Sequence, residues 1–226
     1  MHNIRILCFG DSNTWGTIGK WVEDDTPTLR YANRWTQILQ KTLGSGYSVI
    51  EEGLGGRTCI TPHPTEPWKL GENYLTPCLH THRPIDWVVV MLGTNDLQLN
   101  KTMTEEELPL GISRIIDLIQ ASPKCGHDFV CPKILVLAPV EVMPSAPEGR
   151  TAVYAKFRCD IGRALSLKFP EVYRQVAAEK GCHFLSAQDY AKPGPADGVH
   201  LDEASHIRLG QAVADYIRSV EEANNA

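Results

Sequence analysis

Five short apolar segments, separated by stretches with helical periodicity, constrain the fold of this chain more than any other feature. The third is apolar throughout its middle, as expected of a strand covered on both faces. Strands that alternate with helical segments predict a parallel sheet with helices on both sides. We therefore expect an α/β fold with a central parallel five-stranded sheet. The expected strands are residues 4–9, 47–51, 86–92, 133–138 and 182–185.

The helical segments carry recognisable start signals and apolar stripes. Thr104 is followed three residues later by Glu107, a capping-box pattern at the start of a helix. Asp202 is the expected N-cap of the last helix. His206, in that helix, is expected to be structural or solvent-facing. The residues expected to face the core are Ile207, Gly210, Val213, Ala214 and Ile217. The expected helices are residues 34–43, 105–121, most of 150–180 with an interruption near Pro170, and 203–222.

Length and charge exclude several classes of protein. A chain of 226 residues favours one domain, spanning residues 1–226. The net charge is −5 and no basic field is present, so nucleic acid is not an expected partner. No stretch approaches the roughly 18 apolar residues that span a bilayer. The seven cysteines form no C-x-x-C pair, which is typical of a reducing compartment, so we expect a cytoplasmic protein.

Polar and glycine-containing segments follow several of the expected strands. In an open parallel sheet, ligands bind outside the carboxyl ends of the strands. Segments far apart in the sequence are therefore expected to meet at one crevice. These segments are Gly10-Asp11-Ser12-Asn13-Thr14, Gly53-Leu54-Gly55-Gly56-Arg57, Gly93-Thr94-Asn95-Asp96 and Asp197-Gly198-Val199-His200.

The residue types at this crevice are those that acyl transfer requires. A serine hydroxyl needs an adjacent base, and His200 can take the proton of Ser12. Asp197 can accept a hydrogen bond from the other ring nitrogen and hold the tautomer. The developing oxyanion needs fixed donors, for which the candidates are the N–H groups of Ser12 and Gly56 and the amide of Asn95.

Each of these signals has an ordinary structural explanation when taken alone. Ser12 could cap a turn or a helix, and Asp197 and His200 could form a loop hydrogen bond. Asn95 could form an Asx-turn. The glycines at 53–56 could form a plain turn or an anion-binding nest. The coincidence of all four signals at strand ends, in this order, favours a catalytic site.

Two further sets of residues are candidates for binding. Trp15 could line the substrate pocket or pack in the core, and Asn13 and Gly55 are further pocket candidates. His80 and His82 could bind a metal only with another ligand. No such ligand is recognisable in the sequence, so we expect a pair of histidines in a surface loop and no metal site.

The four sequence blocks resemble those of the GDSL/SGNH hydrolases. They read FGDSNTWG (9–16), EEGLGGRT (51–58), MLGTND (91–96) and DGVH (197–200). Their residues resemble most the corresponding blocks of the mycobacterial arylesterase/acyltransferase subgroup. The resemblance implies a flavodoxin-like three-layer α/β/α sandwich and a triad of Ser12, Asp197 and His200. It also implies an oxyanion hole of Ser12, Gly56 and Asn95. Asn13 replaces the leucine of the family motif, which is not a catalytic group.

The resemblance implies a serine esterase that hydrolyses short-chain, acetyl-type esters through an acyl-enzyme, with no metal or organic cofactor. Acyltransferase or perhydrolase activity could accompany hydrolysis. The alternatives are a carbohydrate O-deacetylase or an acyl-CoA thioesterase on the same fold, and a non-catalytic acyl- or sugar-binding module. The expected partner is a small ester. The resembling subgroup forms oligomers that narrow the active-site entrance, so loops 60–73 and 139–150 are candidate contacts of a homo-oligomer.

Overall fold

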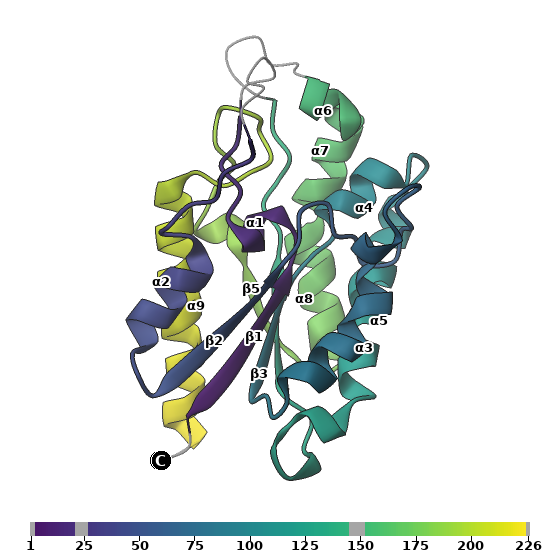
Figure 1. Ribbon diagram of the computed structural model, residues 1–226. Helices are drawn as coiled ribbons and strands as arrows, with labels where there is room; N and C mark the ends of the chain where they lie inside the picture. The colour runs from purple at the N-terminus through teal and green to yellow at the C-terminus, as the bar shows by residue number, and fades with distance from the viewer. Residues whose placement is uncertain (1–2, 21–26, 145–151, 225–226) are drawn as a thin grey trace.

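A computed structural model describes residues 3–20, 27–144 and 152–224 (Figure 1). Its centre is a sheet of five parallel strands in the order β2-β1-β3-β4-β5. The five expected strands are confirmed, and their ends shift by two residues at most. The strands are β1 (Ile4–Gly10), β2 (Tyr47–Gly53), β3 (Trp87–Met91), β4 (Lys133–Ala138) and β5 (His183–Ser186).

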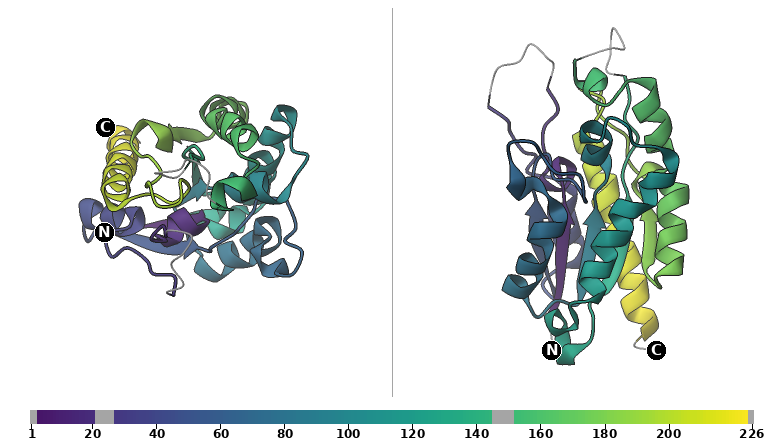
Figure 2. Two further views of the ribbon diagram at one scale, coloured as in Figure 1. Left: turned by 90° about the horizontal axis from the view of Figure 1, so that it is seen from above. Right: turned by 90° about the vertical axis from the view of Figure 1, so that its right-hand side faces the viewer.

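Helices cover both faces of the sheet, which confirms the flavodoxin-like three-layer sandwich. Side chains that alternate along a parallel strand enter two separate cores. In β1, Ile6 and Cys8 pack toward one helical layer, while Leu7 and Phe9 pack toward the other. The first layer contains α2 (Trp35–Leu43) and α9 (Glu203–Asn224). The second contains α3 (Gly71–His82), α5 (Leu108–Gln120) and α8 (Phe169–Glu179), as Figures 1 and 2 show.

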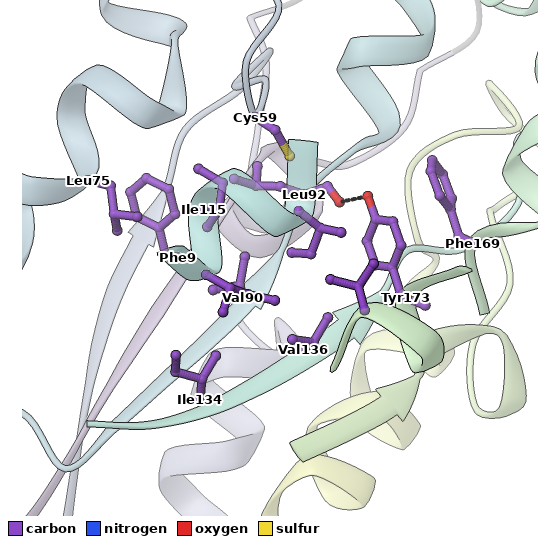
Figure 3. Packing of buried hydrophobic residues seen from close by; sticks show 14 of the residues in the cluster. Phe9, Cys59, Leu75, Val90, Leu92, Ile115, Ile134, Val136, Phe169 and Tyr173 are labelled. Carbon is purple, nitrogen blue, oxygen red and sulfur yellow. Dashed lines mark hydrogen bonds between the residues drawn. The ribbon is translucent and has the colours of Figure 1, made fainter. Parts of the chain in front are cut away.

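The larger core fixes the carboxyl end of β3. Tyr173 of α8 is buried and donates its hydroxyl to the carbonyl oxygen of Leu92 at 2.9 Å (Figure 3). A Cβ atom at Gly93, where φ is +126°, would lie 2.1 Å from that hydroxyl. Only glycine accommodates this close approach. The segment that follows β3 is therefore held firmly against the core.

The helix expected over residues 105–121 is confirmed with a modified start. It begins as the 3-10 turn η2 (Glu105–Glu107), where Thr104 and Glu107 form the expected capping box, and continues as α5. The region 150–180 is helical in three pieces, as far as it lies within the described residues. These are α6 (Ala152–Lys156), α7 (Asp160–Leu167) and α8, whose first turn contains Pro170.

Helix α3 corrects the expectation that His80 and His82 lie in a loop, since both belong to its last turn. Pro77 inside the helix hides it from sequence reasoning, because proline removes a backbone donor and normally marks a helix end. The short elements are α1 (Ser12–Trp15), α4 (Thr94–Leu99), η1 (Pro67–Lys69), η3 (Pro123–Cys125), η4 (His127–Phe129) and η5 (Ala187–Asp189).

Two properties follow for the described part of the chain. No helix in it is long and apolar enough to cross a membrane. All seven cysteines are unpaired thiols. Residues 145–150 of the loop proposed above as an oligomer contact lie outside the described residues.

Four of the five residues expected to face the core from α9 are buried, namely Gly210, Val213, Ala214 and Ile217, and Ile207 is the exception. Ile207 is 41% exposed, whereas His206 is fully buried. The N–H of Trp35, at the start of α2, donates to Nδ1 of His206 at 3.3 Å. A Cβ atom at Gly210 would lie 2.5 Å from the carbonyl oxygen of Trp35, so α2 and α9 cross closely there. A polar contact to a helix end thus places a histidine, rather than an isoleucine, in this core.

We expect His206 to make the folded state less stable as the pH falls. Burial is the main cause that lowers the pKa of His206 from 6.5 to about 4. The unfolded chain therefore binds more protons between these values, and stability is lost as the pH falls through them. Between pH 7 and pH 4.5, the protonation of this ring is expected to lower the free energy of unfolding by about 2–3 kcal/mol. Urea unfolding of the parent and of His206→Gln at both pH values measures it.

In that comparison, His206→Gln should lose less unfolding free energy on acidification than the parent does. His80→Gln, at an exposed position of α3, should behave like the parent. Equal pH dependence in the parent and His206→Gln would contradict the assignment.

Candidate active site

The site lies where the strand order reverses. In the order 2-1-3-4-5, chain connections leave β1 and β3 toward opposite faces, and ligands bind at the carboxyl ends beside this point. Helix α1 follows β1 and helix α4 follows β3 (Figure 1). Ser12 begins α1 and Asn95 lies in the first turn of α4. The topology therefore brings these two side chains to one crevice.

Ser12, His200 and Asp197 form a continuous hydrogen-bonded chain. Nε2 of His200 lies 2.9 Å from Oγ of Ser12, and Nδ1 lies 2.6 Å from Oδ2 of Asp197. The other oxygen of Asp197 accepts the N–H groups of Val199 and His200, both at 2.9 Å. The carboxylate thus holds both the ring and the backbone of its own loop.

The charge on Asp197 fixes the tautomer of His200. Burial raises the pKa of Asp197, but hydrogen bonds and charge from His200, together with the backbone N–H groups, outweigh it and leave the pKa below its usual value. An ionised carboxylate accepts the Nδ1–H of His200 and leaves Nε2 free to accept the hydroxyl proton of Ser12. This arrangement can generate a serine nucleophile.

Asn13 has a different place from the one expected. Its side chain is buried, with 3% of the residue exposed. The amide nitrogen of Asn13 donates to the carbonyl oxygen of Val199 at 3.1 Å, and its amide oxygen accepts the N–H of Leu201 at 2.9 Å. Asn13 therefore holds the loop that carries His200 against α1, and it does not line the cavity. Trp15 also lies outside the lining, with the Arg30 guanidinium 5.0 Å from its ring centroid.

Three groups could bind an oxyanion. The backbone N–H groups of Ser12 and Gly56 have no acceptor among the described residues. Gly56 has φ of +77°, which favours glycine. The amide of Asn95 donates to the carbonyl oxygen of Arg57 at 3.0 Å and makes a longer contact of 3.4 Å to Oδ2 of Asp11. Ser12, Gly56 and Asn95 all line the same cavity.

Buried ionic groups support the loop that carries Gly56. The Arg57 guanidinium donates to the carbonyl oxygen of Gly10 at 3.0 Å and lies 4.2 Å from the ring centroid of Phe9. The carboxylate of Asp96 accepts the N–H of Cys59 at 2.7 Å. These contacts join the ends of β1, β2 and α4, so they fix the relative positions of the three donors.

The cavity beside Ser12 is small, with a volume of about 310 Å³. Gly55 lines it, as expected from the sequence. Helix α6 and the turn after it close one side with Val153, Lys156 and Phe157. The remaining lining residues are Ser12, Thr17, Thr28, Gly56, Asn95, Gln98, Val199 and His200.

Sequence reasoning missed Gly19, which lies next to the site. A Cβ atom at Gly19 would lie 2.9 Å from Oδ2 of Asp197, so only glycine leaves room for that carboxylate. Gly19 lies outside the motif blocks, and no local signal marks it. Asp11, by contrast, belongs to the first sequence block. Burial raises the pKa of its carboxyl group to about 6, against the lowering effects of the Asn13 hydrogen bond and of the charges on His200 and Arg57.

The chain matches the GDSL-like lipase/acylhydrolase family over residues 8–208. The native aryl esterase of M. smegmatis is 36% identical, with a TM-score of 0.85 over 96% of this chain and 99% of that one. A carbohydrate acetylesterase from Sinorhizobium meliloti is 34% identical, with a TM-score of 0.85 over the same shares. No curated protein sequence matches the chain. The two solved structures share its fold over nearly the whole length.

Proposed function

Because the chain belongs to the GDSL-like lipase/acylhydrolase family and is an esterase of that family, we propose that it hydrolyses short-chain, acetyl-type carboxylic esters through an acyl-enzyme. Ser12 is the nucleophile, His200 the general base and Asp197 the group that orients it. The observation that carries the proposal is the hydrogen-bonded chain from Asp197 through His200 to Ser12, with distances of 2.6 and 2.9 Å.

The reaction proceeds in two proton-balanced halves. Oγ of Ser12 attacks the ester carbonyl while Nε2 of His200 takes its proton. The N–H groups of Ser12 and Gly56 and the amide of Asn95 hold the oxyanion. His200 then gives the proton to the leaving alcohol. In the second half, His200 takes a proton from water, the resulting hydroxide attacks the acyl-enzyme, and His200 returns that proton to Oγ of Ser12 as the acid is released.

The cavity supports a small acyl group. Its volume of about 310 Å³ and the apolar walls of Val153, Phe157 and Val199 leave room for a short chain and disfavour bulk water. An alcohol or peroxide that enters in place of water would give acyl transfer. Lys156 is the one Lys or Arg side chain that lines the described cavity. A coenzyme A ester, whose phosphates need several cations, therefore fits less well.

Acetylated sugars are the second substrate class to test. The 34% identity to a carbohydrate acetylesterase favours them, since a sugar hydroxyl is an ordinary ester leaving group. A panel of p-nitrophenyl esters of increasing acyl length, acetylated sugars and acyl-CoAs separates the candidates. We expect kcat/KM to be highest for acetyl esters and to fall with chain length. A preference for long acyl chains or for acyl-CoA would contradict the proposal.

Asn95→Ala is expected to lower kcat for p-nitrophenyl acetate by about 10²–10³-fold, as the loss of an oxyanion donor typically does. The long contact between the Asn95 amide and Asp11 can give way to the oxyanion at little cost, so this donor should act mainly in the transition state. Steady-state kinetics should therefore show the loss in kcat rather than in KM. Asn73→Ala, at an exposed position of α3, is the matched control and should keep the parent rate. A kcat for Asn95→Ala equal to that of the parent would contradict the assignment of Asn95 to the oxyanion hole.

A further inference from the structure

A second cluster of reactive side chains lies between β2 and α3 and contains none of the proposed catalytic residues. It consists of Glu52, Cys78 and His82, whose carboxylate, thiol and imidazole atoms all lie within 4.8 Å of one another. Cys78 and His82 are four residues apart on α3, so they share one face of that helix. Nε2 of His82 lies 2.7 Å from Oε1 of Glu52.

The three side chains of the cluster differ in their exposure to solvent. The Cys78 side chain is buried at 1% exposure, whereas the side chains of His82 and Glu52 are 28% and 18% exposed. An ion entering from solvent would therefore meet the imidazole and the carboxylate first and the thiol at the base.

The combination of donors favours zinc over calcium and magnesium. Thiolate, imidazole and carboxylate are the three side-chain ligands of zinc, whereas calcium and magnesium require oxygen ligands. Three protein ligands leave a fourth tetrahedral position for water. We propose that Glu52, Cys78 and His82 form a Zn²⁺ site. Binding replaces the thiol proton of Cys78, which passes to solvent, so thiolate and carboxylate together balance the charge of the ion.

Neighbouring groups orient the carboxylate for this role. Tyr74 donates its hydroxyl to Oε2 of Glu52 at 3.3 Å, and the Arg57 guanidinium lies 4.0 Å from the same oxygen. Oε1, which faces His82, is the oxygen left for the metal. Outer partners of this kind fix the direction of a metal ligand. None of the three ligands belongs to the proposed esterase machinery, so the site can be tested separately from it.

The test is a titration of the chelator-treated, full-length chain with Co²⁺, followed by displacement with Zn²⁺. Cobalt bound by a thiolate gives a near-ultraviolet charge-transfer band, which reports Cys78 directly. The parent should bind one equivalent with this band. Cys78→Ser should lose the band, and His82→Gln should weaken Zn²⁺ binding by about 10-fold or more, since even outer partners contribute that much.

The chain offers matched controls for both ligand types. Cys131→Ser removes a partly buried thiol outside the cluster, and His80→Gln removes an exposed imidazole from the same helix. Both should keep the band and the affinity of the parent. Retained esterase activity in metal-free Cys78→Ser shows that this variant is folded. A parent that binds no Co²⁺ at one equivalent, or a band that survives in Cys78→Ser, would overturn the proposal.

Discussion

Ser12→Ala is expected to lower kcat for p-nitrophenyl acetate by about 10⁴–10⁶-fold, because it removes the hydroxyl oxygen that we propose forms the acyl-enzyme. Oγ of Ser12 is hydrogen-bonded to Nε2 of His200, and its backbone N–H has no acceptor in the described part of the chain. The substitution removes the proposed nucleophile and keeps the proposed oxyanion donors. A small residual rate above that of water should therefore persist.

The measurement is steady-state hydrolysis of p-nitrophenyl acetate, with rapid mixing to detect the acyl-enzyme burst in the parent. Ser45→Ala, at an exposed position before β2, is the matched control and should keep the burst and the rate. Ser12→Ala should show no burst and only the residual rate, while its thermal unfolding should match that of the parent. If Ser12→Ala hydrolyses the ester at the parent rate, Ser12 is not the nucleophile.

Asp197→Asn should have the second-largest effect, a loss of about 10⁴-fold in kcat, because it reverses the tautomer of His200. The amide oxygen of the new side chain can still accept the N–H groups of Val199 and His200, so the loop keeps its shape. Its NH₂ group then faces Nδ1 of His200. The ring must accept there and carry its proton on Nε2, where it can no longer take the proton of Ser12.

Two measurements separate this effect from a loss of structure. The KM for p-nitrophenyl acetate should change little, since the cavity lining is intact, and the unfolding midpoint should stay near that of the parent. Asp215→Asn, at an exposed position of α9, is the control and should leave kcat unchanged. A kcat for Asp197→Asn within about 10-fold of the parent would mean that another group orients His200.

The sheet was predictable because its strands are apolar on both faces. A run such as Trp87–Met91 can be buried only between two layers, so the pattern alone implies helices on both sides. Helix α3 was not predictable in the same way. Its apolar stripe is weak and Pro77 interrupts it, whereas in the fold Leu75, Cys78 and Leu79 are buried in the larger core and the helix packs against α5.

The orientation of α9 shows how a polar contact can override an apolar pattern. Ile207 belongs to the expected stripe, yet it is exposed while His206 is buried. The hydrogen bond from the N–H of Trp35 to His206 satisfies a donor at the start of α2 that would otherwise be buried without a partner. The sequence of α9 alone contains no information about that donor.

For the site, strand ends and motif blocks located Ser12, Gly56, Asn95 and His200, and the structure places all four around one cavity. Their catalytic roles are the proposal tested above. Which other residues line the cavity was less predictable. Asn13 and Trp15 lie next to Ser12 in sequence, but a helical turn points neighbouring side chains in different directions, and both lie outside the cavity.

The sequence by itself determined the order of strands and helices, the parallel sheet, and the segments that meet at its carboxyl edge. Periodicity and strand-end chemistry are local properties, and they can be read along the chain. The tertiary structure alone decided which side chains face one another across elements, such as Gly19 behind Asp197, or Glu52 opposite Cys78 and His82. These pairings depend on the packing of residues distant in sequence, where a shift of one ångström changes which atoms can touch.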